Sequence, residues 1–249
     1  MWGIPSLDMN IVPIAVAEKK PAAIKFILHN YGNKIEHCFE ENESLMAGYG
    51  KCARHKRCCQ HDVPACGVDI MTGGFPCQPH SAARHKTGKT PGTGQPSSHP
   101  SYNTLHVGAV DYLQARDPAC FCIEQVTTIT NIEKVSGKSH LELFVESVRD
   151  LKAGYKIHVF HMSHGVFASL PKDRVWVIGV SERCGGDEAL QWIVRHIKMA
   201  YLTRQATLPV PWIGGIVDIK GHVEVRRMAL SQVVLRRTPT LKHQTPNIT

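Results

Sequence analysis

Residues 73–81 carry the clearest chemical signal in the sequence, because they present a cysteine where an apolar run ends. They read Gly-Gly-Phe-Pro-Cys-Gln-Pro-His-Ser and come directly after the short apolar stretch 68–72, which is typical of a buried strand. In open α/β sheets, ligands bind at the carboxyl ends of the strands. We therefore interpret Cys77 as a nucleophile at such an end, although free cysteines are more often inert buried side chains.

Two shorter motifs come later in the chain and add an acid and a cation. Glu124 begins Glu-Gln-Val after the apolar run 120–123, and Arg174 ends Lys-Asp-Arg ahead of the β-rich run 175–180. A carboxylate and a cation near strand ends can serve in acid–base and electrostatic catalysis. Each also has a plainer interpretation, because Glu124 alone could be a surface carboxylate and Arg174 a structural ion-pair partner.

Alternating helices and strands must position these residues. Apolar faces predict helices at residues 21–31, 105–113, 139–151 and 190–201. Apolar or β-branched runs predict strands at residues 12–17, 68–72, 120–123, 156–160 and 175–180. This alternation indicates the α/β class with a mostly parallel sheet. The stretch 78–101 is a long loop rich in Pro, Gly and Ser, and loops of that length are usually functional or disordered.

Taken together, the three motifs resemble those of the cytosine-5 DNA methyltransferases. Residues 73–81 are close to that family's nucleophile motif, residues 124–126 to its Glu-Asn-Val, and residues 172–174 to its Arg-x-Arg ahead of a strand. The matches fall in the family's order, and the resemblance extends from about residue 11 to residue 179. It implies a Rossmann-like methyltransferase fold with S-adenosylmethionine as the methyl donor.

The resemblance also implies a mechanism, which the chemistry of these residues supports. Cytosine C5 becomes nucleophilic once a thiolate adds to C6, and Cys77 is the matching residue. Protonation of N3 by Glu124 would ease that addition, and Arg174, with Lys172 as a second choice, would stabilise the cytosine carbonyl. The base must leave a duplex to reach such a pocket, over which the loop 78–101 would close. The implied partner is therefore duplex DNA with a flipped cytosine.

The family's motifs also assign donor and substrate contacts. Glu18 matches the acid that holds the ribose hydroxyls, and Asp69 matches the aspartate that contacts the adenine amine. Either could instead be an ordinary acid at the end of a strand. The remaining assignments are Gly74 and Pro76 to donor binding, and Gln78, Ser81 and Lys172 to substrate binding.

The sequence departs from the family pattern in three places. The family opens with a strand and a Phe-x-Gly-x-Gly loop that cradles the donor, and here only Gly3 could remain of that loop. We therefore expect a sheet without its first, central strand: a gap in the core, two neighbouring strands left unpaired, and an incomplete donor pocket. Gln125 replaces the family's asparagine, and the family's closing motifs are not found.

Positive charge is concentrated near the carboxyl end. The chain has a net charge of +8, and residues 195–249 hold nine Lys or Arg and two Asp or Glu, hence +7 of it. Such a segment favours a polyanionic partner such as nucleic acid, although a solvated tail is the plainer interpretation. We assign residues 1–184 to a catalytic domain with an incomplete amino end. Residues 185–249 form the basic segment, with part of a target-recognition region.

The number and spacing of the cysteines indicate the redox state of the compartment and whether a metal site is expected. Nine cysteines in 249 residues favour a reducing compartment, and neither a membrane span nor a signal peptide is evident. We expect an intracellular protein with no membrane partner, nuclear if its source is eukaryotic. One stretch is dense in possible zinc ligands: Cys52, His55, Cys58, Cys59, His61 and Cys66. Zinc needs four ligands at workable spacing, and without a clean pair of Cys-x-x-Cys motifs we expect no metal site.

Two other functions stay open at this point. One is cytosine-5 methylation of transfer RNA, because one branch of the family acts on tRNA with the same motifs. The other is a catalytically silent protein that binds nucleic acid through its basic end. Methyl incorporation into duplex DNA and tRNA separates the two enzymes, and the effect of mutating Cys77 separates both from the silent protein.

Overall fold

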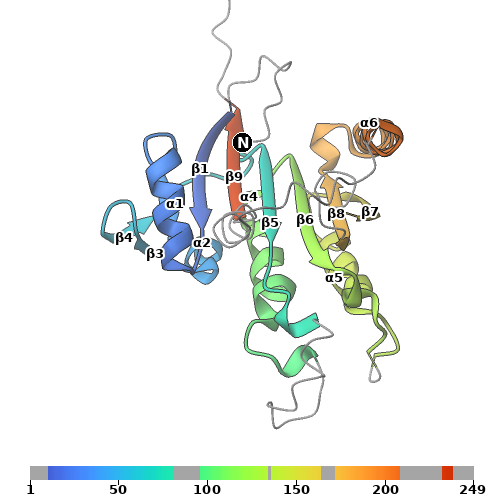
Figure 1. Ribbon diagram of the computed structural model, residues 1–249, viewed down its shortest axis with the longest axis horizontal. Helices are drawn as coiled ribbons and strands as arrows, with labels where there is room; N and C mark the ends of the chain where they lie inside the picture. Colours follow the sequence, from blue (N-terminus) through green and yellow to red (C-terminus); the bar gives the residue numbers. More distant parts are fainter. Residues whose placement is uncertain (1–10, 81–95, 134–135, 164–171, 208–231, 238–249) are drawn as a thin grey trace, which may run out of the picture.

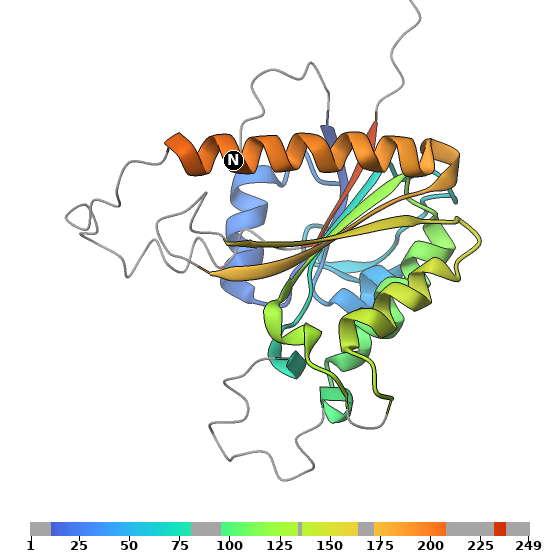
Figure 2. The ribbon, with the colours of Figure 1, turned by 90° about the vertical axis from the view of Figure 1, so that its right-hand side faces the viewer.

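The computed structural model describes residues 11–80, 96–133, 136–163, 172–207 and 232–237, which form one mixed sheet with helices on both faces (Figures 1 and 2). Nine described strands lie in the order β4-β3-β2-β1-β9-β5-β6-β8-β7. Their bounds are β1 Ile11–Ala17, β2 His37–Phe39, β3 Tyr49–Cys52, β4 Arg57–Gln60, β5 Ile70–Gly74, β6 Cys120–Val126, β7 Lys156–Ser163, β8 Asp173–Val180 and β9 Gln232–Arg237.

Strand direction is set by the pairings. β1 and β2 are parallel, β5 and β6 are parallel, and the other neighbours are antiparallel. Six of the described strands therefore run in one direction, whereas β3, β8 and β9 run in the other. The predicted α/β class, with most strands sharing one direction, is confirmed.

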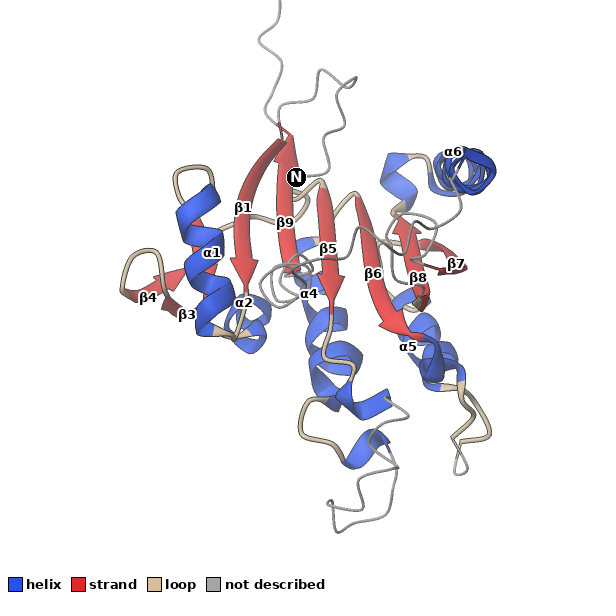
Figure 3. Ribbon diagram, viewed as in Figure 1, coloured by secondary structure: helices blue, strands red, loops and turns tan. Residues whose placement is uncertain are grey.

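Helices cover the two faces of the sheet (Figure 3). One face carries α2 (Asn42–Ala47), α4 (Val110–Arg116) and α5 (His140–Arg149), and the other carries α1 (Pro21–Tyr31) and α6 (Gly186–Thr207). The alternation along β6 shows this, because Phe121 packs on the first side and Cys122 packs with α6 on the second. None of the helices in the described part of the chain is long and apolar enough to cross a membrane.

The helix boundaries obey local sequence signals. α1 begins at Pro21, whose fixed backbone suits a first turn, and ends before Gly32. α5 begins with a capping box: Ser139 Oγ accepts from the Glu142 amide at 3.1 Å, and the Glu142 carboxylate accepts from the Ser139 amide at 2.6 Å. The helix predicted at 105–113 is divided into a π-helical turn, η3 (Thr104–Ala109), and α4.

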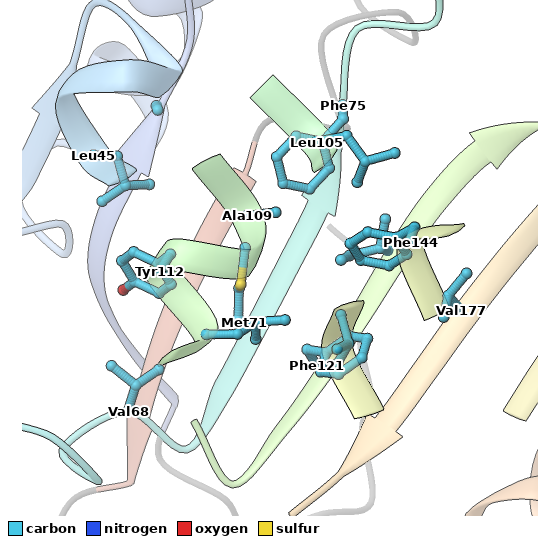
Figure 4. Close-up of a cluster of buried hydrophobic side chains, with 14 of the residues drawn as sticks. Leu45, Val68, Met71, Phe75, Leu105, Ala109, Tyr112, Phe121, Phe144 and Val177 are labelled. Atoms are coloured by element: carbon cyan, nitrogen blue, oxygen red, sulfur yellow. The ribbon is translucent and has the colours of Figure 1, made fainter. Parts of the chain in front are cut away.

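The main core lies between the sheet and helices α2, α4 and α5 (Figure 4). Tyr112, Phe121 and Phe144 are among its largest fully buried side chains, and each is at most 1% exposed. Gly179 of β8 lies opposite Phe121 of β6, and a Cβ at this position would collide with the Phe121 ring. Glycine is therefore what allows β8 to pass beside the ring.

The centre of the sheet corrects one expectation. Where two unpaired neighbouring strands were predicted, β1 and β5 both pair with β9, which lies between them in antiparallel orientation. The predicted gap and unpaired backbone groups are therefore wrong. The physical reason is that buried N–H and C=O groups need partners, and a strand from the carboxyl-terminal part of the chain supplies them.

β1 meets β9 with one irregularity, which has a local cause. The register shifts between Pro13 and Ala15, so that β1 carries one more residue than β9 at this point. Proline has no N–H to donate, and within sheets it is confined to edges, strand starts and bulges. Pro13 lies next to this bulge, ahead of the residues Ala15 to Ala17 at which β1 also pairs with β2.

The segment predicted to be separate, residues 185–249, contributes to the same fold. Leu190 and Val194 of α6 pack against Phe160, Ile178 and Val180 of the sheet. β9 lies within the sheet itself. The domain boundary at residue 184 and a target-recognition role for residues 185–249 stay predictions.

Replacing Val234 with proline should strongly destabilise the fold. Val234 pairs with Ala15 on one side and Met71 on the other, so its N–H faces a neighbouring strand whichever way it points. Loss of that donor and the clash of the ring should lower the free energy of unfolding by about 3 kcal/mol or more. Urea denaturation monitored by circular dichroism measures this. Val234→Ala keeps the N–H and is the matched control; equal losses in both variants would contradict the central place of β9.

Candidate functional site

Three of the predicted site residues meet at one edge of the sheet. β5 and β6 are parallel with Gly74 opposite Glu124, so both strands reach this edge at their carboxyl ends. β8 runs the other way and begins at the same edge, with Arg174 opposite Val126. Cys77 lies three residues beyond Gly74, on the turn into the 3-10 helix η1 (Gln78–His80), and it is exposed. We call this the carboxyl edge.

An ion pair joins the predicted acid and the predicted cation. Arg174 Nε contacts Glu124 Oε1, and the two side chains are 21% and 12% exposed. Arg174 Nη1 also donates to the carbonyl of Asp173 at 2.9 Å. Arg174 therefore forms an ion pair, as its interpretation as a structural residue requires. The same ion pair holds the guanidinium next to Glu124. The catalytic roles of both residues stay predictions.

The loop that carries Cys77 is fastened at both ends by the segment after β6. Gln125 is 1% exposed, and its Nε2 donates to the Phe75 carbonyl at 3.2 Å. Thr128 Oγ1 donates to the His80 carbonyl at the other end of the loop. Between these points, the His80 amide donates to the Cys77 carbonyl at 3.0 Å. Cys77 is thus presented on a short, bridged turn.

The two thiols of β6 differ in character from Cys77. Cys120 begins this strand at the opposite edge of the sheet and Cys122 lies in its middle, and both are half-buried; burial raises their pKa values to about 11 and about 12. A thiol becomes a nucleophile only as the thiolate, so these two are inert near neutral pH. Cys77, by contrast, is exposed at the carboxyl edge, where a substrate can reach it.

A cluster of aromatic rings supports the Cys77 loop, and sequence reasoning missed it. Tyr102 stacks on His106 with ring centroids 4.1 Å apart, and its hydroxyl lies 3.0 Å from His140 Nδ1. The His80 ring lies 5.1 Å from that of His140 and 5.6 Å from that of His106. The cluster therefore joins η1 to η3 and α5. Its four members are spread over about sixty residues, so no local motif could have revealed it.

The predicted donor residues are not all at this edge. Glu18 lies just beyond the end of β1 at the carboxyl edge, where its Oε1 accepts from the Lys20 amide at 2.8 Å. Only β9 separates β1 from β5, so Glu18 lies about 10 Å along the sheet from the Gly74 position. Asp69 precedes β5 at the opposite edge, about 16 Å from Gly74 at the usual rise per residue. The structure does not bring Asp69 together with the other predicted residues.

Most of the predicted substrate contacts lie near Cys77 or Arg174. Gln78 opens η1 and is exposed, and Pro76 lies between Phe75 and Cys77. Lys172 is exposed and directly precedes β8, on the same edge as Arg174. Ser81 and residues 82–95 of the predicted closing loop lie outside the described residues. A separate group that could hold a metal, formed by His37, Cys52, His55 and Cys59, lies at the far end of the sheet.

The fold and the carboxyl edge define an α/β protein with the motif order of cytosine-5 methyltransferases. The family model for C-5 cytosine-specific DNA methylase matches residues 14–207. Because the match covers most of the chain, the protein belongs to the C-5 cytosine-specific DNA methylase family.

One solved structure that is similar to the chain is that of a proposed DNA modification methyltransferase encoded within a prophage, from E. coli. The two are 20% identical with a TM-score of 0.44, and the match covers 68% of this chain and 40% of that one. The chain thus matches less than half of that protein's length. No curated protein sequence matches the chain significantly.

Removing the Gln125 side chain should loosen the Cys77 loop. Gln125→Ala leaves the buried Phe75 carbonyl without its donor, which should lower the free energy of unfolding by about 1–3 kcal/mol. Gln78→Ala, which changes an exposed glutamine on the same loop, should alter it by less than about 0.5 kcal/mol. Urea denaturation of both variants gives the comparison. A loss in Gln125→Ala no larger than in Gln78→Ala would show that the bond does not hold the loop.

The aromatic cluster should make stability depend on pH. Burial lowers the pKa of His106 to about 4, from its ordinary value of 6.5. As the pH falls from 6.5 towards 4, the unfolded chain binds a proton at this residue that the folded chain does not, so the free energy of unfolding falls. The loss is at most about 3 kcal/mol.

Urea denaturation across this pH range measures the slope. His106→Gln should flatten part of it, whereas His29→Gln, which changes an exposed histidine, should leave it unchanged. An unaltered slope in His106→Gln would contradict the assignment.

Proposed function

We propose that this protein methylates C5 of cytosine in DNA through a covalent adduct with Cys77. The observation that carries the proposal is an exposed cysteine at the same edge of the sheet as the paired side chains of Glu124 and Arg174. Family membership supports the same chemistry. Cys77 is exposed at this edge, whereas Cys120 and Cys122 are half-buried and lie at the start and in the middle of β6.

Each residue then has a defined task. The Cys77 thiolate adds to C6 of the cytosine, and Glu124 gives a proton to N3, so that the electron pair of the C5–C6 bond becomes available at C5. Arg174 holds the Glu124 carboxyl group in place and stabilises charge near the cytosine carbonyl. After C5 has taken the methyl group, a water molecule takes the C5 proton, and the electron pair of that C–H bond restores the C5–C6 double bond as the thiolate leaves C6. N3 then returns its proton to Glu124. A base must leave the duplex to enter such a site.

The methyl donor in this proposal is S-adenosylmethionine, which supplies an electrophilic methyl group on its sulfonium. Glu18 fits the donor, because it is a carboxylate at the carboxyl edge and two of its lone pairs can accept from ribose hydroxyls. Gly74 and Pro76 border the same edge beside Cys77. Asp69 does not fit, because it lies at the opposite edge.

DNA is the favoured nucleic acid. The matching family model is that of a DNA methylase, and the basic segment 195–249 complements the phosphate backbone. Transfer RNA offers the same charge, and so it is the competing substrate to be tested beside DNA.

A duplex that carries 5-fluorocytosine tests the proposal. Fluorine at C5 lets the thiolate add and the methyl group transfer, but it blocks the final elimination, so an active protein stays covalently attached. With labelled S-adenosylmethionine, we expect a labelled protein–DNA adduct that is lost in Cys77→Ala and kept in Cys184→Ala. Cys184 is also exposed, but it lies beyond the end of β8 at the other edge of the sheet.

The possible outcomes separate the alternatives. An adduct with 5-fluorocytosine-containing tRNA and none with the duplex would replace DNA by tRNA as the substrate. DNA binding that weakens steeply with salt, with no adduct from folded protein, would instead identify a silent nucleic-acid-binding protein. An adduct that persists in Cys77→Ala would contradict the mechanism.

A further inference from the structure

A second chemical group lies at the β4 end of the sheet, away from the carboxyl-edge residues Cys77 and Glu124. It consists of His37 on β2, Cys52 at the end of β3, His55 in the turn, and Cys59 on β4. One ligand atom from each of these four residues lies within 4.8 Å of the corresponding atoms of the other three. We call this group the Cys/His cluster.

The distances within the cluster are those of ligands around one centre. Both Cys52 Sγ and Cys59 Sγ lie 3.4 Å from the same atom, His55 Nδ1. A ring nitrogen has one in-plane position, holding either a proton or a lone pair, so it cannot make a full hydrogen bond to each of two thiols. In a tetrahedral zinc site, bonds of about 2.3 Å to sulfur and 2.0 Å to nitrogen place these atoms about 3.5 Å apart.

His37 is the fourth possible ligand, and one of its ring nitrogens also needs a partner. Its Nδ1 is buried and has no hydrogen-bond partner among the described residues, and its ring centroid lies 5.2 Å from that of His55. Burying an unpaired polar atom is costly, and nearly all such atoms in folded proteins have a partner. In metal sites, a histidine typically binds the metal through one ring nitrogen and hydrogen-bonds a second group through the other, so that both nitrogens have partners.

The other cysteines and histidines of this stretch are exposed or contact residues outside the cluster. Cys58 is exposed beside Cys59, Cys66 donates to Asp117 at 3.1 Å, and His61 Nε2 lies 3.1 Å from the Tyr112 hydroxyl. Three of the six residues in the dense sequence stretch therefore join the cluster, and His37 comes from fifteen residues before Cys52. This explains why the spacing showed no paired motif and led to the expectation of no metal.

We propose that the Cys/His cluster binds one zinc ion with two thiolates and two imidazoles. Two cysteines and two histidines form a closed tetrahedral set that leaves no position for a substrate, which is typical of structural zinc. The set contains thiolates and no carboxylate, which favours zinc over magnesium or calcium. The site is independent of the methylation proposed above.

The position of the cluster indicates what the zinc ion does. The hairpin β3–β4 joins the sheet at a single paired position, Phe39 opposite Cys52, with a few flanking backbone bonds. Zinc would tie both strands of the hairpin and its turn to His37 on β2. β2 in turn pairs with β1, the strand that leads into Glu18. The ion thus fastens this end of the sheet next to a predicted donor residue.

Metal analysis of the purified chain, residues 1–249, tests the proposal. After dialysis against metal-free buffer, inductively coupled plasma mass spectrometry should find about one zinc ion per chain. Cys59→Ser should lose most of this zinc. Cys58→Ser, which changes the adjacent exposed cysteine outside the cluster, should keep it. Zinc retained equally in both variants would overturn the assignment, because the metal would then lie elsewhere.

A spectroscopic readout on the unaltered chain covers the case in which Cys59→Ser does not fold. Cobalt(II) added after removal of zinc should give the intense visible bands of a tetrahedral ion and a sulfur-to-cobalt charge-transfer band. Added zinc should displace both. The absence of zinc from the purified chain, together with weak octahedral cobalt bands, would overturn the proposal. So would a disulfide between Cys52 and Cys59, detected by thiol titration of protein purified under reducing conditions.

Discussion

Backbone hydrogen bonding in the middle of the sheet is the constraint on which the rest of the structure depends. Strands β1 to β4 form one half and β5 to β8 the other, and among the described strands β9 is the one that pairs with both. Each buried backbone group without a partner costs about 1–3 kcal/mol, so two facing rows of them could not persist. Because β1 and β5 are both antiparallel to β9, they run in the same direction, and Glu18 and Cys77 therefore reach the same edge.

The site at that edge is largely organised by β6 and the turn after it. Successive side chains on a strand point to opposite faces, so Glu124 and Gln125 serve different purposes. Glu124 meets Arg174 on one side, and Gln125 reaches the Phe75 carbonyl on the other. Thr128 then holds the far end of the same loop through the His80 carbonyl. The position of Cys77 is thus set by residues about fifty positions later in the chain.

The features that could be predicted from the sequence were local, and those that could not depended on contacts between distant residues. Apolar periodicity predicted α1 and α5, and Cys77 and Glu124 were each placed after a strand, which puts them at one edge of a parallel pair. Arg174 precedes its strand, so its place at the same edge depends on the antiparallel direction of β8, which the sequence did not indicate. Asp69 was assigned to donor binding through the family, and because it precedes β5 it lies at the opposite edge. The partner of β1 and β5 lies more than 150 residues away in sequence, and His37 reaches Cys52 only after β2 and β3 have formed.

The late position of β9 in the chain has a consequence for biosynthesis. A ribosome releases β1 and β5 long before residues 232–237, so both strands must wait with open edges while most of the chain is made. Open strand edges are templates for pairing with other chains, and pairings between residues far apart in sequence form slowly. During synthesis the nascent protein therefore exposes two strand edges that can pair with other chains until residues 232–237 have been made.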